Sequence, residues 1–404
     1  MDFKLTERQL ELQALARKFA DEELRPQSRE LDKIVDPTNL YPLDLIRKAS
    51  KNGLRTLKIP VEAGGFGADI LTECLVLEEL AVADGGFAML IQHPWREGSI
   101  LEGATTPEQR KRFFTEFMAD DSYMTSYAIT EPHSGSDHTL PYTAELSAGP
   151  QTMAVLEGDE WVINGTKRFI TNSSNATVII VHCRTDATVP WNEGLSLIVV
   201  PTDAPGFRVL KVQDKSGLRL NPNGDIAFEN CRVPRDNLLG EVNKAHAIIR
   251  KYGKGTKTKG ASRAIGIARA CYEEALAFVK QRRQGGKLLI EHQVIAHALV
   301  DMARKIEVAR TMIHRAAWAV EQGMPESQRL EGIAKITATD TVADVSRRAL
   351  ELFGSWGIGR ETQMEKLVRD ASMMLHAPAG NDAFREHLSK IMFQSRPVEL
   401  KVGH

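Results

Sequence analysis

The chain has 404 residues, 42% of them hydrophobic, and its 52 lysines and arginines are nearly balanced by 53 aspartates and glutamates. This length and composition predict two or three folded domains, and the net charge of −1 does not favour nucleic-acid binding. The longest apolar runs, such as "LSLIVV", are too short to cross a bilayer. Because the first residues already read as a capped helix, we expect no signal or transit segment and a cytoplasmic protein.

The four cysteines, Cys74, Cys183, Cys231 and Cys271, lie far apart in the chain. None of them belongs to a CxxC pair or to a Cys/His cluster with the spacing of a zinc site. We therefore expect no metal site and four reduced, buried thiols, which are typical of a reducing compartment.

Residues 1–120 are predicted to form a helical domain. Thr6 with Gln9 has the pattern of a capping box at the start of the first helix. In "TTPEQRKRFF", Thr106 precedes Pro107 in the first turn, and Gln109 can reach back to the cap, so a second helix should start there.

Residues 121–236 are predicted to form a β domain, a small barrel or sandwich, because several short strand-like runs follow each other at regular spacing. The stretch "EWVINGTKRFIT" predicts two strands joined by a hairpin turn at Asn164-Gly165.

Residues 237–404 are predicted to return to helix. The apolar residues from Ile295 to Val320 follow each other at spacings of four and three, which predicts one buried stripe of a long bundle helix ending at Gly323 and Pro325. The fold class is therefore α+β, with a helical domain, a β domain and a helical bundle in that order.

Two motifs leave more than one interpretation open. In "YAITEPHSGSD" (127–137), backbone amides near Gly135 and the hydroxyls of Thr130 and Ser136 could hold a phosphate or a flavin edge, or the stretch could be an ordinary loop. Arg282, near the end of a predicted helix, could cap backbone carbonyls or hold a pyrophosphate. The glycines of "GSWGIG" follow no strand, so they do not indicate a dinucleotide fold.

The order of the motifs is more specific than any one of them. "TEPxxGSD", "WxxNGxKxFIT", "RxxxGxxxxxQ" and "GxxGxGxxxxxxxxKxxRDA" follow one another over nearly the whole chain. In this order the chain resembles the acyl-CoA dehydrogenase family, flavoproteins that oxidise acyl-CoA thioesters between Cα and Cβ. "GKLLIEHQ" and "EKLVRDA" are similar to the medium-chain branch.

The resemblance implies an N-terminal helical domain, a middle β domain, a C-terminal four-helix bundle and FAD shared between the subunits of a homotetramer, a dimer of dimers. It also implies an acyl-CoA substrate and, for an oxidative enzyme, electron-transfer flavoprotein as partner. By position, the cofactor-binding residues are Tyr127, Ile129, Thr130, Gly135, Ser136, Phe169, Thr171, Arg282, Gln293, Glu351, Gly354 and Ser355.

Three positions of this cofactor site depart from the family pattern. Gly285 stands where the family usually has Phe, Glu351 stands where it has Gln, and Ser355 stands where it has a second Gly. Because Arg282, Gln293 and the "TEPxxGSD" stretch are retained, we still expect FAD binding, with its adenine end held differently.

The catalytic base of the family is missing from both of its usual positions. In most members a Glu in the loop after "RDA" removes the α-proton, and its position here falls on Pro378, or on Ala379 if the glycines are aligned. A second family solution places the Glu on a bundle helix, at the position of Thr256. None of these side chains can accept a proton.

Three hypotheses follow from the missing base. A substitute acts, for which His376 is the nearest candidate and Asp382 the next; or the enzyme performs reduction, elimination or desulfination of a CoA thioester, which needs no such base; or the chain is a partner subunit of a mixed assembly. In addition, Ser136 and Arg96 are candidate substrate-binding residues, and Trp95 could face the acyl end. Arg96 would suit a carboxylate or a sulfinate, although an arginine on a helix surface is the simpler interpretation.

Overall fold

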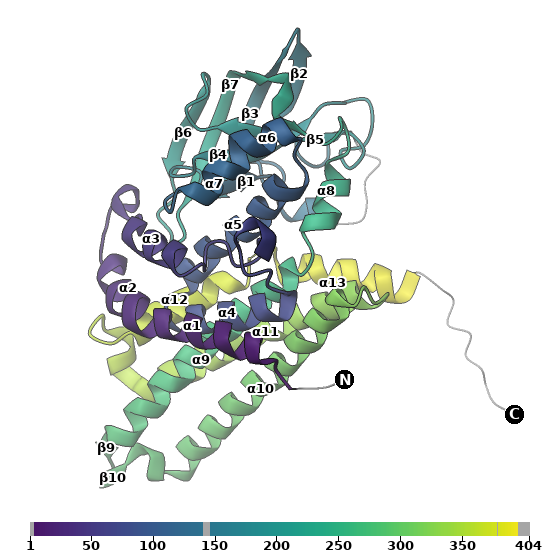
Figure 1. The fold of residues 1–404 in the computed structure, drawn as a ribbon. Helices are drawn as coiled ribbons and strands as arrows, with labels where there is room; N and C mark the ends of the chain where they lie inside the picture. The colour runs from purple at the N-terminus through teal and green to yellow at the C-terminus, as the bar shows by residue number, and fades with distance from the viewer. Residues whose placement is uncertain (1–3, 140–145, 378, 395–404) are drawn as a thin grey trace, which may run out of the picture.

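The computed structural model describes residues 4–139, 146–377 and 379–394. A group of helices comes first, a β sheet follows, and a second group of helices completes the chain, as the α+β prediction requires (Figure 1). The first helices are α1 (Glu7–Phe19), α2 (Arg25–Asp32), α3 (Leu43–Lys51), α4 (Ile70–Ala83), α5 (Gly85–Gly103), α6 (Pro107–Gln109) and α7 (Thr115–Ala119). The capping boxes predicted at Thr6 and Thr106 are both confirmed.

The sheet contains eight strands in the order β6-β7-β3-β2-β4-β5-β8, and β1 pairs with β4 in parallel. In sequence order, the sheet begins with β1 and ends with β8, three residues beyond the limit of 236 expected for the β domain. The sheet extends this far because a turn at 235–237 brings the chain back to pair with β5. The strands are β1 (Thr125–Ala128), β2 (Met153–Glu157), β3 (Glu160–Thr171), β4 (Val178–Arg184), β5 (Leu195–Pro201), β6 (Phe207–Val212), β7 (Asn223–Pro234) and β8 (Leu238–Leu239).

The hairpin predicted at Asn164-Gly165 is wrong, because β3 runs through these residues as one strand. A bulge between Ile163 and Gly165 interrupts its pairing with β7. A side chain at 165 would meet the Thr152 hydroxyl at 2.6 Å, so this glycine allows β3 to pass close to the backbone at Thr152. The hairpin turn lies at Gly158-Asp159 instead, where Gly158 has a φ of 62°.

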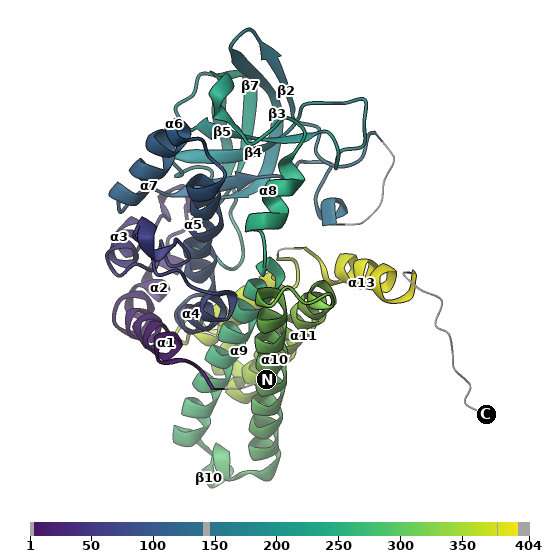
Figure 2. The same cartoon turned by 45° about the vertical axis from the view of Figure 1, so that its right-hand side comes forward.

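The second group of helices forms the bundle. Its elements are α8 (Ala245–Tyr252), α9 (Thr256–Gln281), the short strands β9 (Arg283–Gln284) and β10 (Lys287–Leu288), α10 (Gln293–Glu321), α11 (Ser327–Phe353), α12 (Met364–Met374) and α13 (Asn381–Ser389). The apolar stripe predicted on α10 is buried from Leu299 to Val320, while Ile295 is half-buried. Figure 2 shows α8 between the sheet and the bundle.

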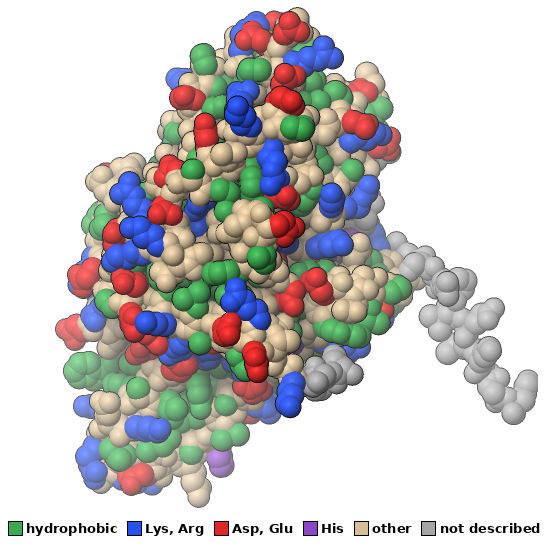
Figure 3. All heavy atoms as spheres, in the orientation of Figure 1, with side chains coloured by type: hydrophobic (Ala, Val, Ile, Leu, Met, Phe, Trp, Pro, Cys, Tyr) green, Lys and Arg blue, Asp and Glu red, His purple; other side chains and the backbone are tan. Residues whose placement is uncertain are grey.

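The remaining expectations from composition can be compared with the structure. All four cysteines are buried and free, as predicted. Within the described residues there is no helix long and apolar enough to span a membrane, and no cluster of three potential metal ligands. Acidic and basic side chains are interspersed over the face drawn in Figure 3, as the balanced charge suggests.

A buried lysine joins the three parts of the chain, and we name this arrangement the Lys366 junction. The Lys366 ammonium donates to Asp84 at 2.9 Å and to Asp370 at 2.7 Å. Asp84 is the N-cap of α5, and Asp370 accepts the backbone N–H of Leu218, which precedes β7. Burial lowers the pKa of Lys366, but the two carboxylates raise it more, so the lysine stays charged.

We expect Lys366→Met to lower the free energy of unfolding by about 3–5 kcal/mol, because two buried carboxylates lose their cation. Adding Asp84→Asn and Asp370→Asn to this variant should recover part of the loss, since it removes the uncompensated charges. Lys305→Met, which breaks an exposed pair with Asp344, is the control and should cost less than about 1 kcal/mol. Denaturant unfolding measures all three; a loss below 1 kcal/mol in Lys366→Met would show that the junction does not hold the parts together.

Candidate active site

The first group of predicted cofactor residues lies at the ends of two neighbouring strands. Tyr127 is on β1, and Ile129 and Thr130 follow it directly, while Phe169 and Thr171 are at the end of β3. The Thr130 carbonyl accepts the Arg168 N–H at 2.8 Å. The Ser126 hydroxyl donates to the Thr171 carbonyl at 2.6 Å. The structure therefore brings "YAIT" and "RFIT" together, as the resemblance implied.

A buried ion pair holds the "TEPHSGSD" segment against the sheet. The Lys167 ammonium donates to Glu131 at 2.9 Å and to the carbonyls of Ile129 and His182. Burial raises the pKa of Glu131, but Lys167 outweighs it and keeps the carboxylate ionised. Six residues further along, the Asp137 carboxylate accepts the N–H of Gly135 and closes a turn. Ser136, between these two residues, is exposed.

Phe169 presents a flat apolar surface on a strained backbone. It has a φ of 56°, and its side chain is 52% exposed. Asp225 accepts its N–H at 3.1 Å, and the Asn223 amide donates to its carbonyl at 2.8 Å and to the Thr171 hydroxyl at 3.1 Å. A non-glycine residue held at positive φ with an exposed ring is typical of a ligand site. These residues fit the ring system of a flavin.

The second group of cofactor residues is far from the first. Arg282, Gln293, Glu351, Gly354 and Ser355 all lie at the end of the bundle near β9 and β10, whereas the sheet is at the opposite end (Figure 1). The structure therefore does not bring the two groups together within one chain.

Aromatic and charged contacts arrange this second group. The Arg282 guanidinium lies 5.9 Å from the centre of the Trp356 ring, which is half exposed. Glu351 pairs with Arg347 at 2.5 Å and with Arg348 at 2.6 Å. Gly354 has a φ of 57°, a conformation that favours glycine.

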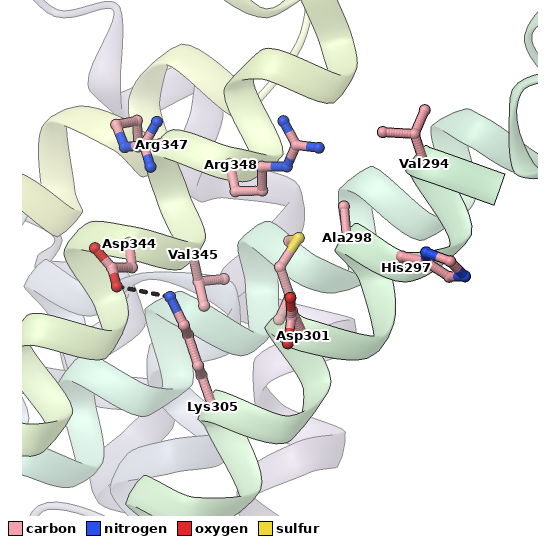
Figure 4. A pocket seen from close by; sticks show the side chains of 10 residues that line it. Val294, His297, Ala298, Asp301, Lys305, Asp344, Val345, Arg347 and Arg348 are labelled. Carbon is pink, nitrogen blue, oxygen red and sulfur yellow. Dashed lines mark hydrogen bonds and ion pairs between the residues drawn. The ribbon is translucent and has the colours of Figure 1, made fainter. Parts of the chain in front are cut away.

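A groove of about 270 Å³ lies between α10 and α11 next to the second group (Figure 4). One wall carries His297 and Asp301 of α10. The two walls are joined by an ion pair of 2.7 Å between Lys305 and Asp344. Arg347 and Arg348, which line the groove, also bind Glu351, so the groove is continuous with the second group.

The loop that lacks the usual base is attached to α11. The Lys335 ammonium donates to the Ala379 carbonyl at 2.8 Å and to the Asn381 side chain at 2.6 Å. The Ala379 side chain is buried, and Pro378 lies outside the described residues. Lys335 therefore holds the backbone beside the expected base position.

The titratable groups nearest to this loop lie on its two sides. His376 is exposed and follows the end of α12. Asp382 pairs with Arg385 at 2.9 Å, so its carboxylate is already engaged. Thr256, the second position for a base, donates its hydroxyl to the Gly253 carbonyl.

The two candidate side chains on α5 are engaged within the protein. Arg96 pairs with the buried Glu97 at 2.7 Å, and its guanidinium lies 3.9 Å from the centre of the Tyr127 ring. Trp95 is fully buried and donates its indole N–H to the Leu54 carbonyl. This ring packs in the core, and its expected place at the acyl end stays a prediction.

Sequence reasoning missed Lys335 and Arg263. Lys335 stands in "GIAKITATD" and has no neighbouring motif, so nothing in the sequence indicates its contact with a loop more than forty residues away. Arg263 follows small residues in "KGASRAIGIA" on a helix whose neighbours are apolar, and it is almost completely buried. The available signal for Arg263 was a single arginine within a run of small and apolar residues.

Comparison with known proteins gives three matches to one family along the chain. Residues 6–121, 126–231 and 257–386 match the models of the acyl-CoA dehydrogenase N-terminal, middle and C-terminal domains. The short-chain specific acyl-CoA dehydrogenase of Clostridium acetobutylicum is 32% identical over 92% of this chain and 94% of its own length. The probable acyl-CoA dehydrogenase YngJ of Bacillus subtilis is also 32% identical, over 93% of this chain and 95% of its own length.

A solved structure agrees with these sequence matches. The butyryl-CoA dehydrogenase of Megasphaera elsdenii has a TM-score of 0.87 with 29% identity, covering 97% of this chain and 99% of the other. The chain belongs to the acyl-CoA dehydrogenase family. It is an acyl-CoA dehydrogenase-like flavoenzyme with FAD as its cofactor, and the family predicted from the motifs is confirmed.

We expect Lys335→Met to loosen the loop and to lower the free energy of unfolding at pH 7 by about 1–3 kcal/mol, because the Ala379 carbonyl and Asn381 lose their donor. Hydrogen exchange of the loop amides should increase. Lys257→Met is the matched control, since Lys257 lies over the same Phe384 ring as Lys335 but donates no hydrogen bond to Ala379 or Asn381. Equal exchange in both variants would contradict the role of Lys335.

The same variant has a pH signature. Burial lowers the pKa of Lys335 to about 8, although Asp340 opposes this. In the unfolded chain a lysine titrates near about 10.4, so between these two values the unfolded state binds more protons. The contribution of Lys335 to stability therefore rises as the pH rises from about 8 to about 10. Lys335→Met should remove this rise from the pH dependence of unfolding.

Proposed function

We propose that this enzyme removes hydrogen from Cα and Cβ of an acyl-CoA thioester, with His376 acting as the base in place of the usual carboxylate. The observation that carries the proposal is the pairing of "YAIT" and "RFIT", which leaves Phe169 half-exposed beside Thr171. Tyr127, Ile129, Thr130, Gly135 and Ser136 would hold the flavin and nearby phosphates, and Phe169 and Thr171 would lie against its ring. Bound FAD supplies the acceptor for the hydride that leaves Cβ.

The protein's own part in this reaction is to hold the thioester and to remove the α-proton. A positioned base contributes roughly 10²–10⁴-fold to such a step. His376 is the only titratable side chain between Asp370 and Asp382. Its place directly after α12 and before the segment held by Lys335 supports this role.

A second candidate function is base-free chemistry on a CoA thioester: reduction, elimination or desulfination. The observation that favours it is the engagement of the other polar groups near the loop. Asp382 binds Arg385, Asn381 binds Lys335, and the Thr256 hydroxyl donates to a backbone carbonyl. The third hypothesis, a partner subunit of a mixed assembly, is disfavoured by the retained flavin residues.

We also propose that each FAD is bound by two chains of a homotetramer. The separation of the two cofactor groups supports this arrangement, since one chain would bind the flavin ring end and its partner the pyrophosphate end. Exposed apolar side chains near the second group, among them Val294, Trp356 and Ile358, also support a covered surface there. Electron-transfer flavoprotein would take up the electrons of an oxidative reaction, and the cytoplasmic location stays a prediction.

We expect Arg282→Ala to weaken FAD retention about 10- to 100-fold, because a charge-assisted contact contributes about 1.5–3 kcal/mol. Arg283→Ala is the matched control, because the neighbouring Arg283 side chain only donates to the Gly286 carbonyl. Flavin absorbance after dialysis measures retention, and sedimentation measures assembly. A monomer with full FAD content would contradict binding across two chains.

The base is tested by α-proton exchange and flavin bleaching with a saturated substrate such as octanoyl-CoA. Both should be slower than in a family member with the usual Glu, by roughly 10²–10⁴-fold. If His376 is the base, His376→Ala should abolish the remaining exchange. His314→Ala, on α10, is the control and should leave the exchange unchanged.

Restoring the carboxylate distinguishes the two candidate functions. Pro378→Glu, or Ala379→Glu in the alternative alignment, should raise proton exchange if only the base is missing. Native turnover that survives His376→Ala, together with a Glu variant that adds dehydrogenation, would favour base-free native chemistry. If neither Glu variant raises exchange, the loop does not lie beside the substrate, and the placement of the base is wrong.

A further inference from the structure

Arg263 differs from every other buried cation in the described part of the chain. It is 4% exposed, its Nε is buried without a partner, and neither a hydrogen bond nor an ion pair joins its guanidinium to the described residues. The other buried lysines and arginines each donate to a carboxylate, a side-chain oxygen or a backbone carbonyl; they are Arg55, Lys167, Arg184, Lys259, Lys335 and Lys366.

Among the residues that the structure describes, no anion compensates the charge on Arg263. Burial lowers the pKa of Arg263 to about 10, which still leaves it protonated at neutral pH. The neighbouring Cys74 cannot neutralise it, because burial raises the pKa of that thiol to about 12. A buried guanidinium without an anion is costly, and such groups are usually paired or bind a ligand.

Arg263 lies on the buried side of α9, beside Cys74 of α4. Thr256, Gly260, Arg263 and Ile267 follow each other at spacings of four, three and four, so they share one face of the helix. This face packs on the start of α5, because a Cβ on Gly85 would lie 2.5 Å from the Ile267 side chain. Gly260 carries no side chain, so no Cβ stands between Thr256 and Arg263 on this stripe.

We propose that Arg263 binds a carboxylate at the far end of the acyl group, so that the substrate is the CoA thioester of a short dicarboxylic acid. This inference rests on the proposed function and on the position of Thr256, which is one of the two places of the base in the family, so that the substrate Cα would lie near Thr256. Arg263 is two turns from Thr256, roughly 10 Å along the axis, and a helical side chain leans back toward the N-terminus. The distance left between the substrate Cα and the Arg263 guanidinium suits an acyl chain of about five or six carbons, at roughly 1.5 Å per bond.

The same geometry explains why Arg96 is the weaker candidate for this contact. Glu97 already neutralises Arg96, and the Tyr127 ring covers its face. The Arg263 fork has no partner in the described part of the chain, and its planar donors match the two oxygens of a carboxylate. A methyl-ended chain would leave this cation without a partner, so the site selects against fatty acyl groups.

The test compares ligands of equal length in the FAD-loaded enzyme. Glutaryl-CoA is compared with pentanoyl-CoA, and adipoyl-CoA with hexanoyl-CoA, by the change in flavin absorbance and by calorimetry. We expect the wild type to bind the carboxylate-ended member about 10- to 100-fold more tightly. Arg263→Met should abolish this preference, and Arg263→Lys should keep part of it. Arg208→Met, on the exposed strand β6, should keep all of it.

A stability measurement separates ligand binding from a structural role. Without ligand, Arg263→Met should melt no lower than the wild type, because it replaces an unpaired buried charge with an apolar side chain. A lower melting temperature together with an unchanged ligand preference would overturn the proposal. So would a preference that is lost in Arg96→Met and kept in Arg263→Met.

The failure of this inference differs from the failure of the proposed function. If the wild type binds both members of each pair equally well, Arg263 does not recognise a carboxylate, while the acyl-CoA activity stands. If no acyl-CoA of either kind changes the flavin spectrum, the proposed function fails and the inference fails with it.

Discussion

One buried ammonium group holds the three parts of this chain in a fixed relation. Lys366 comes from the bundle, and Asp84 comes from the first group of helices. Asp370, which also binds Lys366, accepts the N–H of Leu218 and so connects the segment before β7 to the other two parts. Two carboxylates around one cation are stable in the interior only when all the contacts are made together. The sheet, α5 and α12 therefore keep their mutual positions, because each of them is anchored at this point.

The elements with a strong local signal could be predicted from the sequence. The capping boxes at Thr6 and Thr106 and the apolar stripe of α10 depend on contacts within a few residues. Asn164-Gly165 misled the prediction because a bulge opposite β7 and a close approach to Thr152 require the same glycine that a hairpin turn would. Here the long-range pairing of β3 overrides the local preference.

The residues of the candidate site also differ in whether a local sequence motif or a long-range contact gives them their role. The positions of "YAIT" and "RFIT" could be taken from the resemblance, and the structure places them together. Lys335 has no local signal, because its partner is distant in sequence. Arg263 has one, an arginine among small and apolar residues, but its meaning depends on the lack of a partner among the described residues. Trp95 shows the converse, because an aromatic residue in a promising stretch packs into the core.

The burial of the four thiols has a practical consequence. Burial raises the pKa of the Cys74 and Cys183 thiols to about 12 and that of Cys231 to about 11, and Cys271 is shifted in the same direction. The thiolate is the reactive form, so none of these sulfurs should react readily with alkylating probes in the folded protein. A cysteine introduced on the surface would then be the single labelling position of the native enzyme. A spectroscopic probe could be attached there without first removing any natural residue.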